Sequence, residues 1–506
     1  MRFFNLFNRV FTHPHPRKDP YFPQPISAGA VREIFSNCSD FNIRQIAVGG
    51  GDGPLVSFCY IDGLVDGEYL SQTVLKPLTE LWRFPQPQSQ QHCIDSILRG
   101  GVFSACAQEK TSLDQLTAAL VSGFCALIFD GEATAVVFET RSAVSRSVSE
   151  PGIEKAVKGA KDAFVERLRT NTALVRRKLC TPRLKIRQGV VGRQSETQVA
   201  LVYLEDISDP TVVSELLRRL EKIDIDGLLA SGNLEEYISD RPGSIFPQTL
   251  YTERPDRFAI NLLDGCVGLL VDGLPLGFIV PAALPELMRV PEDAAQHYAV
   301  SSFLRFLRYL ASAITVLLPG VYVAMALYHQ EMLPLKLLLS IIESKQQVPF
   351  GTAFEILGML LAFEILQEAG LRLPKPVGET VGIIGALIVG QSAVEAKVVS
   401  PIAVIVVAVA GITGYTQPSQ DLGAALRLCR FFLVLCGLLG GMFGIMAGTV
   451  LIVYHLSELT SFGVPYMAPL TDGGPLGIFK LLFRPPLRRD KNRSETLNTP
   501  NRRNQR

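Results

Sequence analysis

Charged side chains are scarce in this sequence, and the scarcity is uneven. Of the 97 Asp, Glu, Lys and Arg residues, 67 lie in residues 1–300 and only 21 in residues 301–484. They make up 19% of the chain, whereas soluble proteins typically carry about 25%. This distribution excludes a uniform soluble fold. It predicts a soluble front part, a membrane-embedded back part and a short basic tail.

Motifs for catalysis and ligand binding are absent too. The sequence has no CxxC pair, HExxH, GxSxG or GxxxxGK[ST], although residues 49–53 are rich in glycine. Two histidines, His13 and His15, are too few to predict a metal site. We therefore expect no enzyme activity, no cofactor and no metal. A net charge of +1 argues against nucleic-acid binding.

A secretory signal is missing as well. Residues 1–20 lack an uninterrupted apolar core and a small-residue cleavage site. The nine cysteines are scattered, most of them in apolar runs, as expected for buried free thiols in a reducing compartment. We therefore expect a flexible N-terminus and a soluble part that stays in the cytoplasm.

The soluble part contains an internal duplication. Residues 114–138 and 256–280 each contain an apolar strand, an Asp-Gly turn and a second apolar strand, and matched residues lie 142 positions apart. Asp-Gly tolerates the backbone of a tight turn, so each copy predicts a β-hairpin. The expected fold is an α/β soluble region of two similar subdomains followed by an all-α polytopic membrane domain.

These patterns divide the chain into six parts. They are a flexible N-terminus (1–29), soluble α/β subdomain 1 (30–145), a helical connector (146–194), soluble α/β subdomain 2 (195–290), a transmembrane helical domain (300–470) and a basic cytoplasmic tail (471–506). Within subdomain 2, a helix is expected to start near residues 252–257, with Pro255 in its first turn.

The back part contains four segments that are expected to cross the membrane. They are residues 303–328, 377–397, 398–413 and 431–454. Residues 332–369 could add a fifth and a sixth crossing. Arginines precede two of the spans, and the tail from Arg484 is strongly basic, which is typical of cytoplasmic edges. With both ends in the cytoplasm, the number of crossings is even.

Three carboxylates interrupt the apolar residues 349–369. Glu355, Glu364 and Glu368 cannot all face lipid, because each would cost several kcal/mol at the bilayer centre unless paired or hydrated. This segment is therefore expected to be interfacial, re-entrant or packed inside an assembly.

Residues 377–397 combine small residues with a polar stripe. The glycines permit close helix approach, and Gln391 and Glu395 share one helix face. Either the segment lines a water-filled path, or it is a tightly packed helix whose polar residues lie near the interface. Lys397 could neutralise Glu395. The pore-lining candidates are Gly378, Gly382, Gly385, Gln391, Ser392 and Glu395.

Several long stretches give the chain a resemblance to a known family. Over roughly residues 45–485 it resembles the A subunit of the spore germinant receptors, the GerA family. One departure is Lys158-Gly159-Ala160, where the family usually has Arg-Gly-Pro. The matching stretches include FPQTLYTERPDR (246–257), LLVDGLPLGFIVP (269–281), FEILQEAGLRLPKPVGETVGIIGALIVGQSAVEAKVVSP (363–401) and LTSFGVPYMAPL (459–470).

The resemblance implies a protein of the spore inner membrane. It implies work with a transporter-like B-type subunit that senses the nutrient and with a C-type lipoprotein subunit. It further implies a homo-oligomer, in contact with membrane lipid, around a germinant-gated pore for monovalent cations. One alternative is a SpoVAF-type subunit that amplifies ion release. A secondary transporter is less favoured, because the membrane half shows no inverted repeat.

Overall fold

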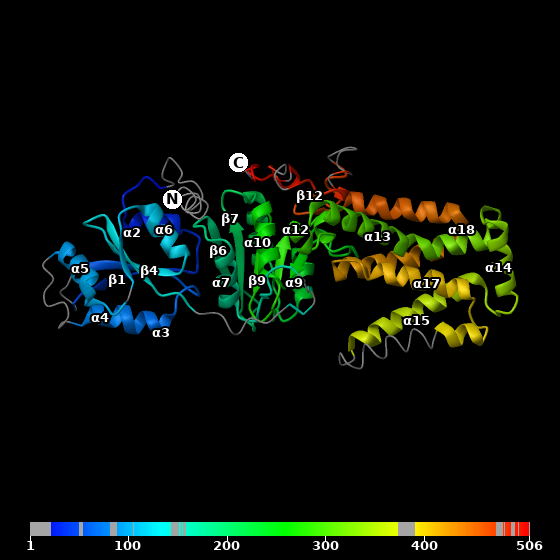
Figure 1. Ribbon diagram of the computed structural model, residues 1–506, viewed down its shortest axis with the longest axis horizontal. Coiled ribbons are helices and arrows are strands. Elements are labelled where there is room, and N and C mark those ends of the chain that lie inside the picture. The colour runs from blue at the N-terminus through cyan, green and yellow to red at the C-terminus, as the bar shows by residue number, and fades with distance from the viewer. Residues whose placement is uncertain are drawn as a thin grey trace, which may run out of the picture.

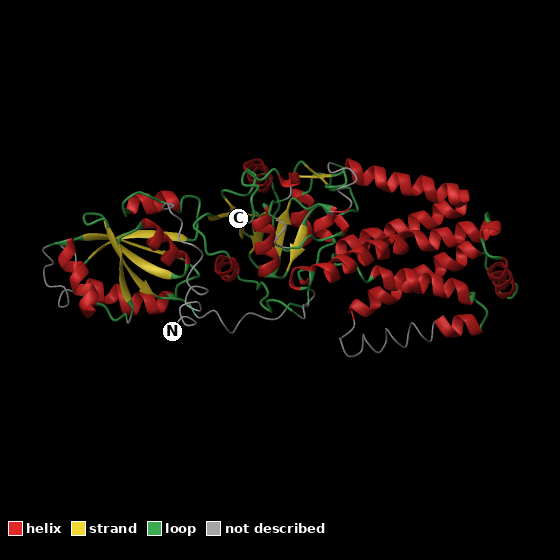
Figure 2. Cartoon of the chain, turned by 45° about the horizontal axis from the view of Figure 1, so that its top comes forward, coloured by secondary structure: helices red, strands yellow, loops and turns green. Residues whose placement is uncertain are grey.

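The computed structural model describes residues 22–49, 54–80, 89–104, 106–142, 151–152, 154, 158–372, 390–471, 479, 481–486, 491–493 and 495–504. Within them, two α/β lobes lie in a row and lead into a bundle of long helices (Figure 1). Figure 2 shows the strands gathered in the two lobes and the helices side by side at the opposite end. The expected fold class is therefore confirmed.

The first lobe is built on a five-stranded antiparallel sheet in the order β1-β2-β4-β5-β3. Helices cover both faces, so the central strand β4 is buried along nearly its whole length. The strands are β1 (Phe41–Ala47), β2 (Leu55–Ile61), β3 (Ala107–Lys110), β4 (Phe124–Phe129) and β5 (Thr134–Glu139). The helices are α2 (Ala28–Ile34), α3 (Gly67–Leu70), α4 (Lys76–Thr79), α5 (Gln90–Ser96) and α6 (Leu113–Val121), with π-helical turns at Ser71–Leu75 and Ile97–Gly101.

The chain already packs on this lobe before α2. Ile26 is buried in the core beneath α2 and α6, and the Ser27 hydroxyl accepts a hydrogen bond from the backbone of Ala30. Such a cap satisfies one of the free N–H groups at the start of a helix. This part of the expected flexible N-terminus is thus folded, whereas residues 1–21 lie outside the described residues.

The second lobe repeats the first. Its sheet has the order β6-β7-β9-β10-β8, which matches the first sheet strand by strand, and helices again cover both faces. The strands are β6 (Leu184–Val191), β7 (Thr197–Leu204), β8 (Leu250–Thr252), β9 (Val267–Val271) and β10 (Gly277–Val280). The helices are α7 (Leu168–Lys178), α8 (Pro210–Glu221), α9 (Ser231–Ile238) and α10 (Pro255–Asp264). The shared topology confirms the two similar subdomains.

The duplication extends to single backbone positions, with one exception. Gly123 and Gly265 follow α6 and α10 with φ of 87° and 114°, a region that glycine adopts at little cost. In the second hairpin Gly273 takes the positive φ of the turn, as the Asp-Gly pattern predicts. In the first hairpin the positive φ falls on Ala133 instead of Gly131.

The segment expected as a helical connector is mostly not helical. Among the described residues of this segment α7 is the only helix, and the following strand β6 already belongs to the second sheet. The second lobe therefore begins before residue 195. β6 was missed because it is an edge strand with an exposed, polar middle, in which Arg187 and Gln188 break the apolar pattern.

Two short helices, α11 (Leu284–Leu287) and α12 (Glu292–Ala295), connect the second lobe to the bundle. The bundle helices are α13 (Tyr298–Leu327), α14 (Leu335–Lys345), α15 (Thr352–Arg372), α17 (Pro401–Gly414) and α18 (Gln420–Glu458). By length and composition, α13 and α18 could cross a membrane, and α17 is a shorter apolar helix. Pro319 lies inside α13 without interrupting it.

α18 is folded into a hairpin. Gly441 has φ 56° and ψ −140°, far from helical values, and the chain reverses there. A Cβ at Gly448 would lie 2.7 Å from Leu433, and one at Gly437 would lie 3.0 Å from Ile445, so the two arms pack against each other. The single span expected over residues 431–454 is thus wrong. The apolar run is continuous in sequence and hides the reversal.

Candidate functional site

The described end of the predicted pore segment is a helical turn with an exposed polar face. Residues 390–395 are helical, and Gln391, Ser392 and Glu395 are all exposed. The Gln391 amide donates to the Glu395 carboxylate over 3.1 Å, so the two share a face as expected. The helix ends at Lys397, whose φ is 56°. Gly378, Gly382 and Gly385 lie outside the described residues.

Glu355 is the most buried of the three bundle carboxylates. Its side chain is 3% exposed, and it accepts a hydrogen bond from the backbone N–H of Ser400. Ser400 caps α17, so the carboxylate faces the partial positive charge at the start of that helix. Its second oxygen, Oε2, has no hydrogen-bond partner. Glu355 therefore joins α15 to α17 at the start of α17.

Glu364 joins α15 to the first arm of α18. Its oxygens lie 3.2 Å from Arg427 Nε and 3.3 Å from Arg430 Nη2. Arg430 is 1% exposed, and such a buried charge needs a partner. Arg427 also donates to Gln367 on α15. Sequence reasoning placed these arginines at a cytoplasmic edge and missed their role inside the bundle.

Glu368, one turn further along α15, is exposed. The structure therefore separates the three carboxylates into a buried helix cap, an ion-pair partner and a surface group. Whether the segment is interfacial, re-entrant or packed inside an assembly stays a prediction, but two of its carboxylates have partners within the chain. The spacing along the sequence could not identify the partners, because Arg427 and Arg430 are more than 60 residues away.

The bundle and the second lobe share one hydrophobic core. Leu422 and Cys429 from the first arm of α18, and Leu459 and Tyr466 beyond its second arm, are buried with side chains of the second sheet. Both ends of the α18 hairpin are therefore built into the second lobe. A displacement of this lobe would move both arms.

Polar contacts reinforce this junction. Arg241 forms an ion pair of 2.5 Å with Glu458, and Thr460 donates to Asp240 over 2.9 Å. Ser461 donates to the backbone of Gln248 over 2.8 Å. The loop between α9 and β8 therefore binds the end of α18 and the residues that follow it. These contacts could not be predicted from the sequence, because the partners lie more than 200 residues apart.

One carboxylate at the junction, that of Glu235, has a pKa near neutral pH. Burial raises the pKa of Glu235 on α9 to about 7, and the nearby carboxylate of Asp421 at the start of α18 adds to the effect. Two like charges disfavour ionisation of each other. Two carboxylates of like charge, those of Glu235 and Asp421, therefore act on each other electrostatically where the lobe meets the bundle.

Known proteins are similar in sequence to most of this chain. The family model described as Bacillus/Clostridium GerA spore germination protein matches residues 29–496. Spore germination protein KA of Bacillus subtilis (strain 168) is 37% identical over 470 residues, covering 93% of this chain and 86% of that protein. Stage V sporulation protein AF of the same organism is 28% identical over 477 residues, covering 94% and 93%.

A solved structure is also similar to this chain. The crystal structure of the N-terminal domain of the A subunit of the Bacillus megaterium spore germinant receptor GerK3 is 30% identical and aligns with 51% of this chain and 93% of its own, with a TM-score of 0.39. The match of the family model over residues 29–496, together with the near-complete relatives, leads to one conclusion: the chain belongs to the GerA family of spore germination proteins.

Proposed function

We propose that this chain is the A subunit of a nutrient germinant receptor and forms, as a homo-oligomer, a germinant-gated cation channel in the spore inner membrane. The observation that carries the proposal is the exposed Gln391–Glu395 pair on one face of a helical turn just before α17. Membership of the GerA family and the two long apolar helices indicate a membrane protein. A carboxylate at a pore entrance favours cations, as charged rings do in cation channels.

Gating would start in the soluble lobes. Since both ends of the α18 hairpin are buried in the core of the second lobe, a shift of that lobe would pull on both arms. In the proposal, B-type and C-type partner subunits supply the nutrient signal and the lobes transmit it to the bundle. The bundle surface contacts membrane lipid.

The proposed topology places the soluble lobes and the tail together in the cytoplasm. Arg493 in the tail donates to the backbone carbonyl of Leu263 on α10, which supports a location on the same side as the lobes. An even number of crossings follows. Protease protection of the tail in right-side-out vesicles, with cleavage after permeabilisation, is the expected result.

The test is ion flux through the full-length protein in liposomes, with and without the partner subunits. Nutrient-dependent efflux of monovalent cations is expected only when the partners are present. Efflux without nutrient or partners would favour the second candidate, a SpoVAF-type amplifying subunit, to which the near-complete match with stage V sporulation protein AF points. Absence of flux in every combination would contradict both.

A further inference from the structure

We propose that the junction between the second lobe and the bundle holds an anionic phospholipid, in an apolar groove between the start of α13 and residues 483–486 of the tail. The groove has a volume of about 470 Å³, within the range of small-molecule sites. This inference rests on the proposed membrane location of the bundle. Its lining residues are Tyr298, Ala299, Ser302, Phe303, Phe306, Phe483, Arg484 and Pro486.

The tail segment is fixed to α12 and α13 by partly buried hydrogen bonds. The Ser302 side chain is 7% exposed, and its hydroxyl accepts from the backbone N–H of Arg484 over 2.9 Å. The same hydroxyl donates to the backbone of Tyr298 over 2.7 Å. The Arg484 guanidinium donates to the backbone carbonyl of Asp293. The tail segment is thus held in a defined position on α13, and the groove between them is part of the folded structure.

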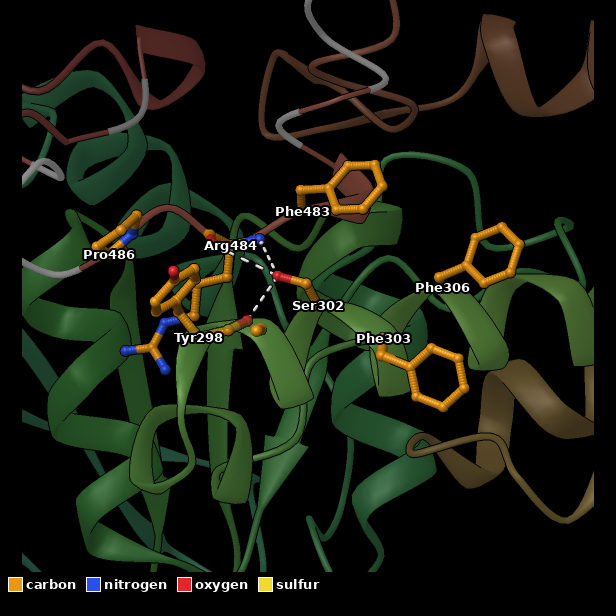
Figure 3. A pocket seen from close by; sticks show the side chains of 8 residues that line it. Tyr298, Ser302, Phe303, Phe306, Phe483, Arg484 and Pro486 are labelled. Carbon is orange, nitrogen blue, oxygen red and sulfur yellow. Dashed lines mark hydrogen bonds between the residues drawn. The ribbon is translucent and has the colours of Figure 1, made fainter.

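The walls of the groove are aromatic and open to the outside. In Figure 3 the rings of Phe303, Phe306 and Phe483 point to the same side, while Ser302 bonds to Arg484 behind them. Phe303 is 59% exposed and Phe483 is 48% exposed. Phe479 stacks on Phe483 with ring centroids 5.9 Å apart. Phenylalanine and leucine side chains form the apolar face of helices that lie in the membrane interface.

The groove is continuous with the outer face of α13. Leu307 and Leu310 follow Phe303 and Phe306 on the same helix and are exposed in turn. This stripe leads from the groove onto the part of α13 that is apolar enough to cross a membrane. An acyl chain lying in the groove would therefore continue into the hydrocarbon region beside α13.

The charge at the rim favours an anionic headgroup. Arg308 binds the Asp293 carboxylate over 2.5 Å, Arg305 lies 3.8 Å from it, and Arg484 binds the backbone of the same residue. Two guanidinium groups thus face the Asp293 carboxylate and a third binds its backbone carbonyl, so basic groups outnumber the one carboxylate in this cluster. Basic side chains beside a membrane attract anionic lipids. An apolar groove with a positive rim matches the chemistry of an anionic phospholipid.

Tryptophan quenching by brominated phospholipids tests the inference on the full-length chain. The only tryptophan, Trp82, is replaced in a W82F background, and F303W is added as the reporter. Vesicles contain the same minor fraction of either brominated anionic or brominated zwitterionic lipid. We expect the anionic lipid to be enriched about fivefold at the F303W reporter, which corresponds to about 1 kcal/mol for one basic side chain.

Two further variants separate the possible outcomes. V450W, at an exposed position of the second arm of α18, should be quenched equally by both lipids, and R484Q should abolish the preference seen with F303W. Equal quenching of F303W by both lipids, or none while V450W is quenched, would overturn the inference and leave the membrane location intact. Loss of quenching at both reporters would overturn the membrane location itself. Copy-to-copy cross-linking through F303C without lipid quenching would assign the groove to a subunit interface.

Discussion

Arg176 and Asp40 form a buried, two-pronged ion pair between the lobes. Arg176 Nε and Nη2 lie 2.7 Å and 2.8 Å from the two carboxylate oxygens, and the arginine side chain is 0% exposed. The third nitrogen, Nη1, donates to the backbone of Leu184 in β6. The pair therefore ties the first lobe to both α7 and the second sheet.

Removal of one partner of this pair should destabilise the protein strongly. We expect D40A to lower the free energy of unfolding by about 3–5 kcal/mol, because it leaves a buried charge without compensation. The measurement is chemical unfolding of the purified protein. D62A is the matched control, since Asp62 pairs with Arg169 on the same helix α7 but both side chains are solvent-accessible. It should cost less than about 1 kcal/mol. Equal losses would contradict the distinction.

Of the adjacent glycines Gly440 and Gly441, only Gly441 should be required for the reversal of α18. G441A forces a side chain into a backbone region that is strained for all residues except glycine, at a cost of about 1–3 kcal/mol. G440A is the control, because a Cβ at Gly440 meets nothing within 4 Å and its backbone is helical. We expect a lower thermal midpoint in detergent for G441A alone. The same midpoint in both variants would argue against the hairpin.

The ion pairs of Glu364 should stabilise the bundle. In E364Q, the buried Arg430 loses its carboxylate partner, and we expect a loss of about 3–5 kcal/mol. E368Q changes an exposed carboxylate on the same helix and serves as the control, with an effect below about 1 kcal/mol. Thermal denaturation in detergent compares the two. A larger effect of E368Q would contradict the assignment.

Glu395 should determine cation preference if its helix lines the pore. E395Q keeps the shape and removes the charge, so cation selectivity should fall. The Q391C thiol, on the same exposed face, should react with a water-soluble reagent. Both are measured in liposomes. Unchanged conductance and selectivity in E395Q together with an unreactive Q391C thiol would assign the segment to helix packing.

Stability should depend on pH through Glu235. Its pKa in the folded protein is about 7, above its ordinary value of 4.5. A carboxyl with a raised folded pKa binds protons more readily when folded, so its contribution is full below about 4.5 and is lost as pH rises toward 7. E235Q should flatten this part of the stability profile. A profile that keeps its slope in E235Q would point to another group.

Local patterns predicted the soluble lobes well because their signals are short-range. The Asp-Gly hairpins and the helix start at Pro255 each follow from neighbouring residues. The duplicated topology then followed from the spacing of 142 residues. Edge strand β6 was missed because solvent-facing charges break the apolar alternation that identifies a strand.

The bundle was harder to predict, because the contacts that define it join residues far apart in the sequence and because the chain reversal leaves no mark in the hydropathy pattern. Gly441 reverses the chain within an uninterrupted apolar run, where hydropathy is the same for one helix and for two. The partners of Glu355 and Glu364 come from α17 and α18, and no spacing rule connects them to α15. The polar face of Gln391 and Glu395 was predictable, because it depends on a single helical turn.

The common core of the second lobe and α18 also determines the order in which the two lobes complete their folding during synthesis. Among the described residues, the two cores of the first lobe consist of side chains from residues 22–138 together with Ala173, so this lobe can fold soon after it leaves the ribosome. The second lobe lacks Leu459 and Tyr466 until more than 170 further residues have been made. The core of the second lobe is therefore complete only after the two ends of the α18 hairpin have docked on it. If the bundle failed to insert into the membrane, the second lobe would keep part of its apolar core uncovered and would be a target of cellular quality control. This would hold even for a variant whose substitutions all lie in the bundle.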